Sequence, residues 1–159
     1  MPRNISKQTL TFQCSKSMKW IRTPPDIWQM LTQEFDFTVD VCASDDNHLL
    51  PRYYTRETDG LKQDWSGEVA YIHPMFDGKI NRFVQKAAQT PSFTGVFFIP
   101  AATGTKYFHE HIYQNPHVEI RFLRNPKRGY HFGHEDGTWG DPNSVGYIKP
   151  MMIVIFRNP

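Results

Sequence analysis

The sequence predicts an α/β domain in which a mostly parallel central sheet carries helices on both faces. Apolar segments of strand length alternate along the chain with segments whose apolar residues recur at helical spacing. The segment 95–100 is apolar almost throughout, which is typical of a strand buried on both faces of a parallel sheet. The length of 159 residues fits one domain with a substantial core.

The first predicted elements are a helix and a strand. Thr23 followed by two prolines is typical of a helix start, because proline lacks only an amide that has no helical partner there. Apolar residues at helical spacing extend this helix to about Glu34. The segment 37–42 then alternates apolar side chains around Asp40, and this pattern predicts the first core strand.

The remaining elements follow in regular alternation. Val69 begins a short strand that stops at a proline, and Ile80 begins a helix with one apolar face. Residues 125–150 are rich in Gly and Pro and have no period, which predicts a long loop with a functional role or high mobility. The other predicted elements are a strand at 95–100, a helix at 105–113, and strands at 118–123 and 151–156.

Composition indicates a single cytoplasmic domain. Residues 1–18 are polar and aperiodic and are expected to form a loose arm, with residues 19–159 as one domain. A net charge of +2 neither demands nor excludes a nucleic-acid partner. The first ten residues lack the apolar core of a signal peptide, and no run reaches membrane-spanning length, so no membrane partner is expected. Cys14 and Cys42 make no disulfide framework, which favours a reducing compartment.

The segment 69–76 is the first candidate site, since ligands bind at the carboxyl ends of strands in open α/β sheets. His73 stands immediately before Pro74, which biases its backbone towards an extended conformation. Phe76 follows three residues further on. A polar group, a proline and an aromatic ring in this order fit a flat, hydrogen-bonding ligand. The alternative is a proline turn with a buried phenylalanine.

Further motifs accompany this segment in a fixed order along the chain. They are Thr23-Pro24, Asp40-Val41-Cys42-Ala43-Ser44, Asp59-Gly60-Leu61, Asp64-Trp65-Ser66-Gly67, Phe98-Ile99-Pro100-Ala101, Phe108-His109-Glu110 and Val154-Ile155-Phe156. From about Trp20 to Arg157 the ordered set resembles the short phage-type DNA adenine-N6 methyltransferases. The resemblance implies a Rossmann-like class I methyltransferase fold with an antiparallel last strand. It also implies S-adenosylmethionine as the methyl donor, double-stranded DNA as the substrate and the host-cell cytoplasm as the location.

The resemblance assigns three of these segments to the cofactor. In the first strand, a carboxylate followed by small residues would let the aminoacyl part of the cofactor lie against the backbone. The Thr-Pro segment matches the part of the family that closes over the cofactor, and the Asp-Trp segment matches the part beside the adenosine. The structural alternatives are an incidental Asp, plain helix capping, and a core Trp beside a turn. The implied cofactor residues are Thr23, Pro24, Asp40, Cys42, Ala43, Ser44, Asp64 and Trp65.

His73-Pro74-Met75-Phe76 occupies the catalytic position, where the family has Asp or Asn, then Pro-Pro, then Tyr or Phe. There a side-chain oxygen and a backbone carbonyl accept the two protons of the adenine amino group, and the aromatic ring stacks on the flipped base. Phe76 keeps the ring and Pro74 keeps the rigid carbonyl, whereas Met75 loosens the turn. A histidine accepts only when its ring is neutral, so activity is expected to fall as the pH drops through the imidazole range.

The Gly-rich loop is the candidate DNA-reading element, because the chain is too short for a separate recognition domain. Basic residues interleave there with aromatic residues, which suits phosphate contact and base stacking. The assigned residues are Arg121, Arg124, Lys127, Arg128, Tyr130 and Trp139. The alternative is a solvated loop with aromatic residues packed beneath it. Metal-ligand residue types at 109–111 and 131–136 match no zinc spacing, so no metal is expected.

The sequence leaves three functional interpretations open. The first is a phage-type adenine-N6 methyltransferase that protects DNA from host restriction. The second is a methyltransferase-like protein that has lost turnover and binds DNA, or a host defence protein, to block restriction. The departures at His73 and Met75 motivate the second. A closed cofactor pocket with a purely interacting role is a third reading.

Overall fold

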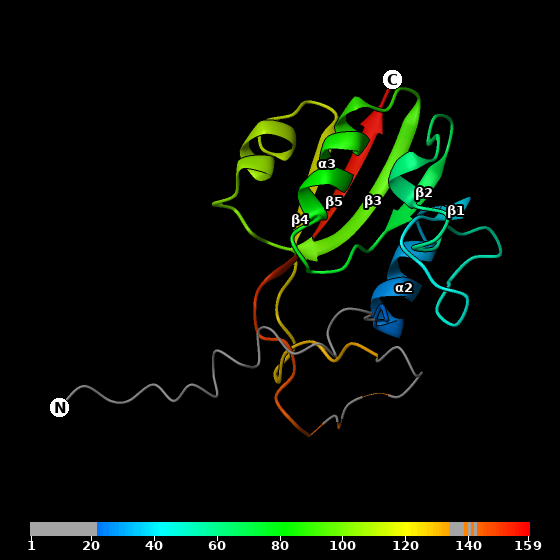
Figure 1. Cartoon of the computed structure of the whole chain (residues 1–159). Helices are drawn as coiled ribbons and strands as arrows, with labels where there is room; N and C mark the ends of the chain where they lie inside the picture. The colour runs from blue at the N-terminus through cyan, green and yellow to red at the C-terminus, as the bar shows by residue number, and fades with distance from the viewer. Residues whose placement is uncertain (1–21, 134–138, 140, 142) are drawn as a thin grey trace.

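A five-stranded mixed sheet forms the centre of the molecule, with strand order β1-β2-β3-β5-β4 (Figure 1). The computed structural model describes residues 22–133, 139, 141 and 143–159. Strands β1, β2 and β3 run parallel, and β5 runs antiparallel between β3 and β4. The antiparallel last strand confirms the arrangement implied by the sequence. The strands are β1 (Val39–Asp40), β2 (Val69–Ile72), β3 (Phe93–Pro100), β4 (Val118–Phe122) and β5 (Met151–Asn158).

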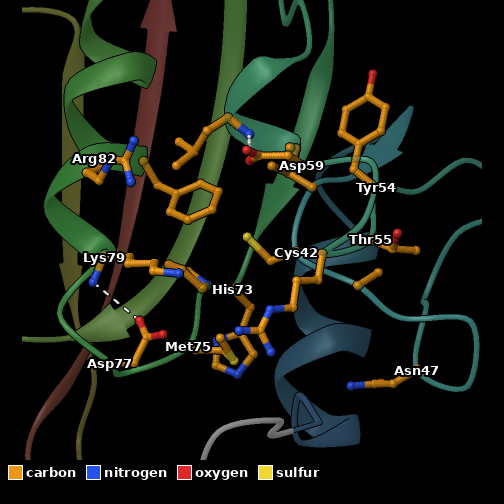
Figure 2. A pocket seen from close by; sticks show the side chains of 17 residues that line it. Cys42, Asn47, Tyr54, Thr55, Asp59, His73, Met75, Asp77, Lys79 and Arg82 are labelled. Atoms are coloured by element: carbon orange, nitrogen blue, oxygen red, sulfur yellow. Dashed lines mark hydrogen bonds between the residues drawn. The ribbon is translucent and has the colours of Figure 1, made fainter.

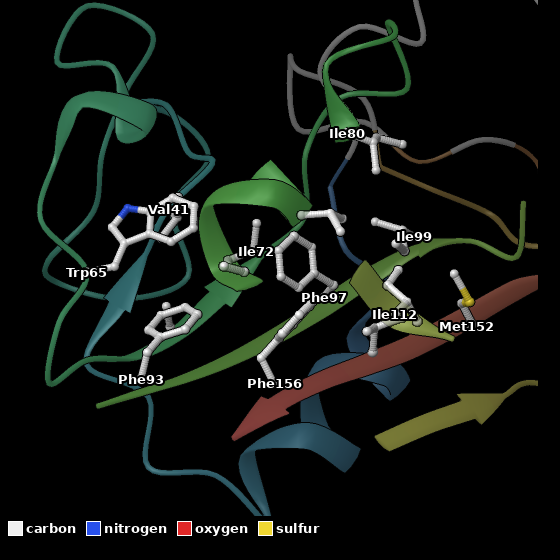
Figure 3. Packing of buried hydrophobic residues seen from close by; sticks show 14 of the residues in the cluster. Val41, Trp65, Ile72, Ile80, Phe93, Phe97, Ile99, Ile112, Met152 and Phe156 are labelled. Carbon is white, nitrogen blue, oxygen red and sulfur yellow. The ribbon is translucent and has the colours of Figure 1, made fainter. Parts of the chain in front are cut away.

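Helices cover both faces of this sheet. Successive side chains of a strand point to opposite faces. On β2 and β3, Ile72 and Phe97 pack in the core cluster that contains α3, which Figure 3 shows in part. Tyr71 and Phe98 pack in the second cluster, which contains α2. Among the described residues the helical elements are α2 (Pro25–Thr32), the 3-10 turn η2 (Gly60–Lys62), α3 (Ile80–Gln89) and the π-helical turn η3 (Phe108–Ile112).

The first helix is shorter than predicted, and its cap is different. It begins at Pro25, and Pro24 rather than Thr23 occupies the cap position, without a side-chain hydrogen bond. The hydroxyl of Thr23 lies 2.6 Å from the Tyr71 hydroxyl instead. Thr23 therefore ties the chain before α2 to β2, and plain helix capping is wrong for this residue.

Two other elements differ from their predicted form. The first strand was expected over 37–42, but only Val39–Asp40 is a strand; the Val41 amide still donates to the Tyr71 carbonyl at 3.0 Å. The segment expected as a regular helix at 105–113 closes as a π-helical turn, with the Tyr113 amide bonded to the Phe108 carbonyl at 2.7 Å. The expected arm at 1–18 lies outside the described residues.

Two segments of the long Gly-rich region pair through a β-bridge between Tyr130 and Tyr147; we call residues 124–133 and 143–149 the ribbon. Tyr130 and Tyr147 exchange two backbone hydrogen bonds of 2.8 Å each. Gly129 has φ +78°, and a Cβ there would stand 2.6 Å from the Tyr147 carbonyl oxygen, so the close pairing requires glycine. None of the helices in the described parts of the chain is long and apolar enough to cross a membrane.

Candidate active site at the carboxyl ends of β1 and β2

A pocket of about 290 Å³ opens where β1 and β2 end. We call it the strand-end pocket. Figure 2 shows Lys79 and Arg82 on one side of it, Asp59 on the other, and Cys42 and His73 between them. Strand ends supply the floor because Cys42 follows β1 and His73 follows β2 directly. This is the position at which an open α/β sheet binds its ligands.

One wall of the strand-end pocket depends on a close approach between η2 and β1. A Cβ on Gly60 would lie 2.6 Å from the Val41 carbonyl oxygen, so only glycine fits there. Trp65 holds this contact, since its indole Nε1 donates to the Gly60 carbonyl at 2.9 Å. Asp59 sits at φ +53°, and its carboxylate accepts the Leu61 amide at 3.1 Å.

His73 presents an unshared nitrogen lone pair. Its Nδ1 lies 2.8 Å from the Phe98 carbonyl oxygen, which can only accept, so Nδ1 carries the proton and Nε2 carries the lone pair. Among the described residues Nε2 has no hydrogen-bond partner, although it is buried. A buried acceptor without a partner calls for explanation, because such groups are rarely left unpaired.

Burial keeps the His73 ring neutral. Desolvation lowers the pKa of His73 to about 4, outweighing the hydrogen bond to the Phe98 carbonyl, which raises it. The ring therefore stays an acceptor well below the usual imidazole range. The lowered pKa places the loss of the neutral His73 ring below the ordinary imidazole range, in which the sequence predicts a loss of activity.

Aromatic rings enclose His73. Phe98 stacks on it with ring centroids 5.2 Å apart, and Phe132 of the ribbon stacks at 5.9 Å. Phe76 meets the imidazole edge-on at 5.8 Å. Phe76 in turn contacts Tyr147 of the ribbon at 5.6 Å. The long loop is thus part of the same aromatic cluster as the predicted catalytic residues.

The segment after β2 separates two pockets. Met75, Asp77 and Lys79 line the strand-end pocket. The intervening residues Phe76 and Gly78 line a second pocket of about 580 Å³. The second pocket also carries Tyr107 and Tyr147 with two lysines, Lys106 and Lys149. Ligands bound in the two pockets would therefore lie on opposite sides of this short segment.

Of the cofactor residues expected in and after the first strand, some line the strand-end pocket and others do not. Cys42 and Ala43 line the strand-end pocket. Asp40 does not; it is buried, and its carboxylate accepts the Leu49 amide at 3.0 Å. Burial raises the pKa of Asp40 to about 6. Ser44 pairs through its backbone with Asn47, whose side chain lines the pocket in its place.

The other implied cofactor residues lie outside the strand-end pocket. Thr23 is bonded to Tyr71, and Pro24 caps α2. Trp65 is 1 % exposed and stacks on Phe93 at 5.6 Å, so it is a core residue that positions Gly60 rather than a stacking partner for a ligand. Asp64 is exposed, and its carboxylate accepts the Ser66 amide at 2.9 Å.

The residues predicted to bind DNA differ in whether their side chains are free to contact it. Arg121 is engaged by carboxylates, with Glu34 at 2.6 Å and Glu119 at 2.5 Å, so it is not free for a phosphate. Tyr130 is buried in the aromatic cluster and cannot stack on an incoming base. The exposed members of the set are Arg124, Lys127, Arg128 and Trp139.

Sequence reasoning did not single out the charged residues of the strand-end pocket. They are Arg56, Asp59, Asp77, Lys79 and Arg82. The Asp59-Gly60-Leu61 motif was the available signal for the first wall, but its role depends on the packing of η2 against β1. Within the described residues no group of three or more His, Cys, Asp or Glu side chains could hold a metal ion; residues 134–136 are outside that range.

A comparison with known protein families shows which family the chain belongs to. Residues 11–158 match the family model described as DNA N-6-adenine-methyltransferase (Dam). The chain belongs to the Dam family. No curated protein matches the chain in sequence. The mixed five-stranded sheet is consistent with a methyltransferase-like fold, and Dam-family membership implies S-adenosylmethionine as the cofactor and DNA as the substrate.

Proposed function

We propose that this Dam-family chain transfers a methyl group from S-adenosylmethionine to the N6 atom of adenine in DNA, and that the modification protects DNA from host restriction. One observation supports the proposal most. The His73 Nε2 lone pair is buried, unpartnered among the described residues, and belongs to a residue that lines the strand-end pocket. An amino group of adenine is a donor that would satisfy it.

The strand-end pocket suits the cofactor in shape and charge. S-adenosylmethionine carries no phosphate, so a Gly-rich phosphate loop is not needed. Cys42 and Ala43 are small enough for close approach to the backbone after β1. Lys79 and Arg82 are cations for the carboxylate of the cofactor, and Asp59 on the facing wall is an acceptor for its hydroxyl or amino groups. When bound, the cofactor supplies an electrophilic methyl group.

The chain's own residues would prepare the adenine. His73 Nε2 accepts a hydrogen bond from one N–H of the amino group and the Pro74 carbonyl accepts one from the other, which localises the nitrogen lone pair for methyl transfer. Phe76 stacks on the flipped base, a contact worth about 1–3 kcal/mol. Because the pKa of His73 is about 4, its ring is a weak base, so His73 orients the amino group and the released proton goes to solvent.

Label transfer tests the proposal. The protein is incubated with tritiated S-adenosylmethionine and unmethylated plasmid DNA, and we expect label in the adenine fraction. His73→Ala should reduce the rate by about 10²–10³, as expected for loss of one transition-state hydrogen bond. Gln85→Ala, an exposed residue of α3, is the matched control. No label above a heat-inactivated sample at any pH from 6 to 9 would refute the activity.

The same cluster supports a second candidate, a protein that has lost turnover and binds DNA or a host defence protein. Phe132 already covers one face of the His73 ring, and Tyr147 already contacts Phe76. The double variant His73→Asn with Met75→Pro restores the family residues at both positions. Methylation that starts only in the double variant would favour this candidate; equal rates in both proteins would count against it.

We propose that exposed cations of the ribbon contact the DNA phosphates. Arg124, Lys127 and Arg128 are exposed, and Trp139, 44 % exposed, offers a ring for stacking. Each phosphate contact should add to the salt dependence of binding, because neutralised phosphates release counterions. Arg121 is left out of this set, since its carboxylate partners already occupy it.

A further inference from the structure

The ribbon has two faces of different character. Tyr130, Phe132 and Tyr147 pack inward in the aromatic cluster beside His73 and Phe76. Outside that cluster two large apolar side chains face solvent: Val145 is 62 % exposed and Ile148 is 64 % exposed. Exposed apolar groups held close together on an ordered backbone are typical of a contact surface.

Basic residues surround this apolar pair. Lys127, Arg128, Val145 and Ile148 line one hollow of about 430 Å³. Within the described part of the chain no ion pair engages Lys127, Arg128 or Lys149. A surface with cations at its rim and apolar groups at its centre complements DNA. The cations meet phosphates, and apolar side chains enter between base steps.

The backbone around the pair is held in place. The Ile148 carbonyl accepts from the Asn125 side chain at 2.8 Å, and the Arg128 guanidinium donates to the Asn143 carbonyl at 2.9 Å. The Gly146 amide donates to the Arg128 carbonyl at 2.8 Å. A side chain that separates stacked bases must resist being pushed back, and these bonds supply that support.

Tyr147 connects the apolar pair to the proposed active site. It lies between Gly146 and Ile148 in the ribbon, and its ring contacts Phe76 with centroids 5.6 Å apart. Tyr147 and Lys149 also line the second pocket, next to Phe76. Ile148 is therefore adjacent to, and Val145 two residues from, the tyrosine whose ring contacts Phe76, the ring that would stack on a flipped adenine.

We propose that Val145 and Ile148 form a wedge that enters the DNA helix beside the target adenine and opens it. Arg128 and Lys127 hold the flanking phosphates, and Tyr147 places the wedge in register with Phe76. The inference rests on the proposed function, because it assigns strand opening to the same site. It adds a device for base flipping that lies outside the catalytic segment.

Permanganate probing tests the wedge without turnover, because permanganate oxidises thymines that have lost their stacking. The full chain is mixed with S-adenosylhomocysteine and plasmid DNA at saturation, judged by mobility shift, and the oxidised thymines are mapped. The wild type should give discrete reactive thymines. The double variant Val145→Ser with Ile148→Ser should bind DNA but lose reactivity by at least about fivefold. Ile148→Met should keep it. Met30→Ser, an exposed apolar residue of α2, is the control and should also keep it.

Three results would overturn the wedge. They are an unchanged footprint in the double variant, the absence of any reactive thymine with the wild type, and loss of all DNA binding in the double variant, which would assign the pair to affinity alone. Parallel label transfer separates this inference from the proposed function. Opening without label leaves the wedge standing and refutes methylation. Label transfer together with unchanged thymine reactivity in the double variant refutes the wedge and leaves methylation standing.

Discussion

His73 illustrates how tertiary packing sets the chemistry of a single side chain. In water its ring would titrate near pH 6.5 and exchange the proton between its nitrogens. Here the Phe98 carbonyl fixes the proton on Nδ1, and burial lowers the pKa to about 4. The result is a fixed acceptor at Nε2, the role that we propose for this residue. A histidine can therefore stand at this position without becoming charged.

The pH dependence of methylation follows from this pKa. The ratio of the wild-type rate to the His73→Asn rate should be constant between pH 5.5 and 8, because asparagine does not titrate and His73 stays neutral. The ratio should fall only as the pH approaches about 4. Single-turnover label transfer at each pH measures it. A fall centred near pH 6.5 would show that the ring titrates normally and is solvated.

Asp40 should make stability depend on pH in the opposite sense to His73. Its folded pKa, about 6, is above the ordinary value of 3.8 for an aspartate. The folded state therefore holds the proton more tightly, and stability is lost as the pH rises from about 4 through 6. His73, with a lowered pKa, loses stability as the pH falls from about 6.5 to 4. The two contributions oppose each other over the same range.

The Asp40→Asn variant separates the two contributions. At pH 7.5 it should raise the unfolding free energy by on the order of 2 kcal/mol, because it removes a buried charge while its amide oxygen can still accept the Leu49 amide. The gain should vanish near pH 4.5, and urea denaturation at both pH values measures it. Asp36→Asn, at an exposed carboxylate, is the control. An equal gain at both pH values would show that Asp40 is not the titrating group.

At the scale of elements, an ion network connects α2 to the edge of the sheet. Arg121 of β4 donates two hydrogen bonds to Glu34, just beyond α2, at 2.6 and 2.8 Å. Glu119 and Arg157 extend the network to β5, with a separation of 2.6 Å between them. The groups are partly exposed, so solvent screens the network and its contribution to stability is modest.

Arg121→Ala and the pair Lys127→Ala, Arg128→Ala should have opposite effects. Loss of Arg121 should lower the unfolding free energy by about 0.5–1 kcal/mol and leave DNA affinity unchanged. Loss of the two ribbon cations removes only the Arg128 bond to the Asn143 carbonyl from the described contacts, and it should weaken DNA binding and reduce the salt slope by about one for each residue. Denaturation and fluorescence anisotropy at several salt concentrations measure both. Weaker DNA binding by Arg121→Ala would return this residue to the DNA surface.

At the scale of the whole molecule, the strand-end pocket exists because distant segments meet. Residues after β1, η2, the segment after β2 and the start of α3 all line it. Trp65 and Gly60 hold one wall, and Lys86 of α3 reaches the Leu61 carbonyl at 3.0 Å. A ligand that contacts all these segments should stabilise the fold as a whole, because it binds only the folded chain.

Calorimetric titration with S-adenosylhomocysteine checks this. We expect micromolar binding and a rise in unfolding free energy of about 2.7 kcal/mol at a hundredfold excess over Kd. Arg82→Ala should weaken binding by about tenfold, as expected for loss of one charge-assisted contact. Gln85→Ala, on the same helix but outside the pocket lining, should bind as the wild type does. No binding by the wild type would favour a purely interacting role.

The order of the elements and the position of His73 at a strand end follow from local patterns in the sequence. Strand and helix periods, proline at element ends and the ordered motifs are local properties of the chain. They predict a strand that begins at Val69 and another at 95–100; the structure has these strands as Val69–Ile72 and Phe93–Pro100, with His73 directly after the first. The roles predicted for Trp65 and Arg121 differ from those in the structure, because burial and ion pairing depend on residues far away in the sequence.

Patterns along the chain were enough to indicate the α/β class and the family. Which nitrogen of His73 is the acceptor depends on the packed fold, since a carbonyl 25 residues away holds the other nitrogen. It also placed the ribbon against Phe76 and left Val145 and Ile148 facing solvent. Desolvation and hydrogen-bond partners arise from contacts between segments, and no local pattern in the chain specifies them.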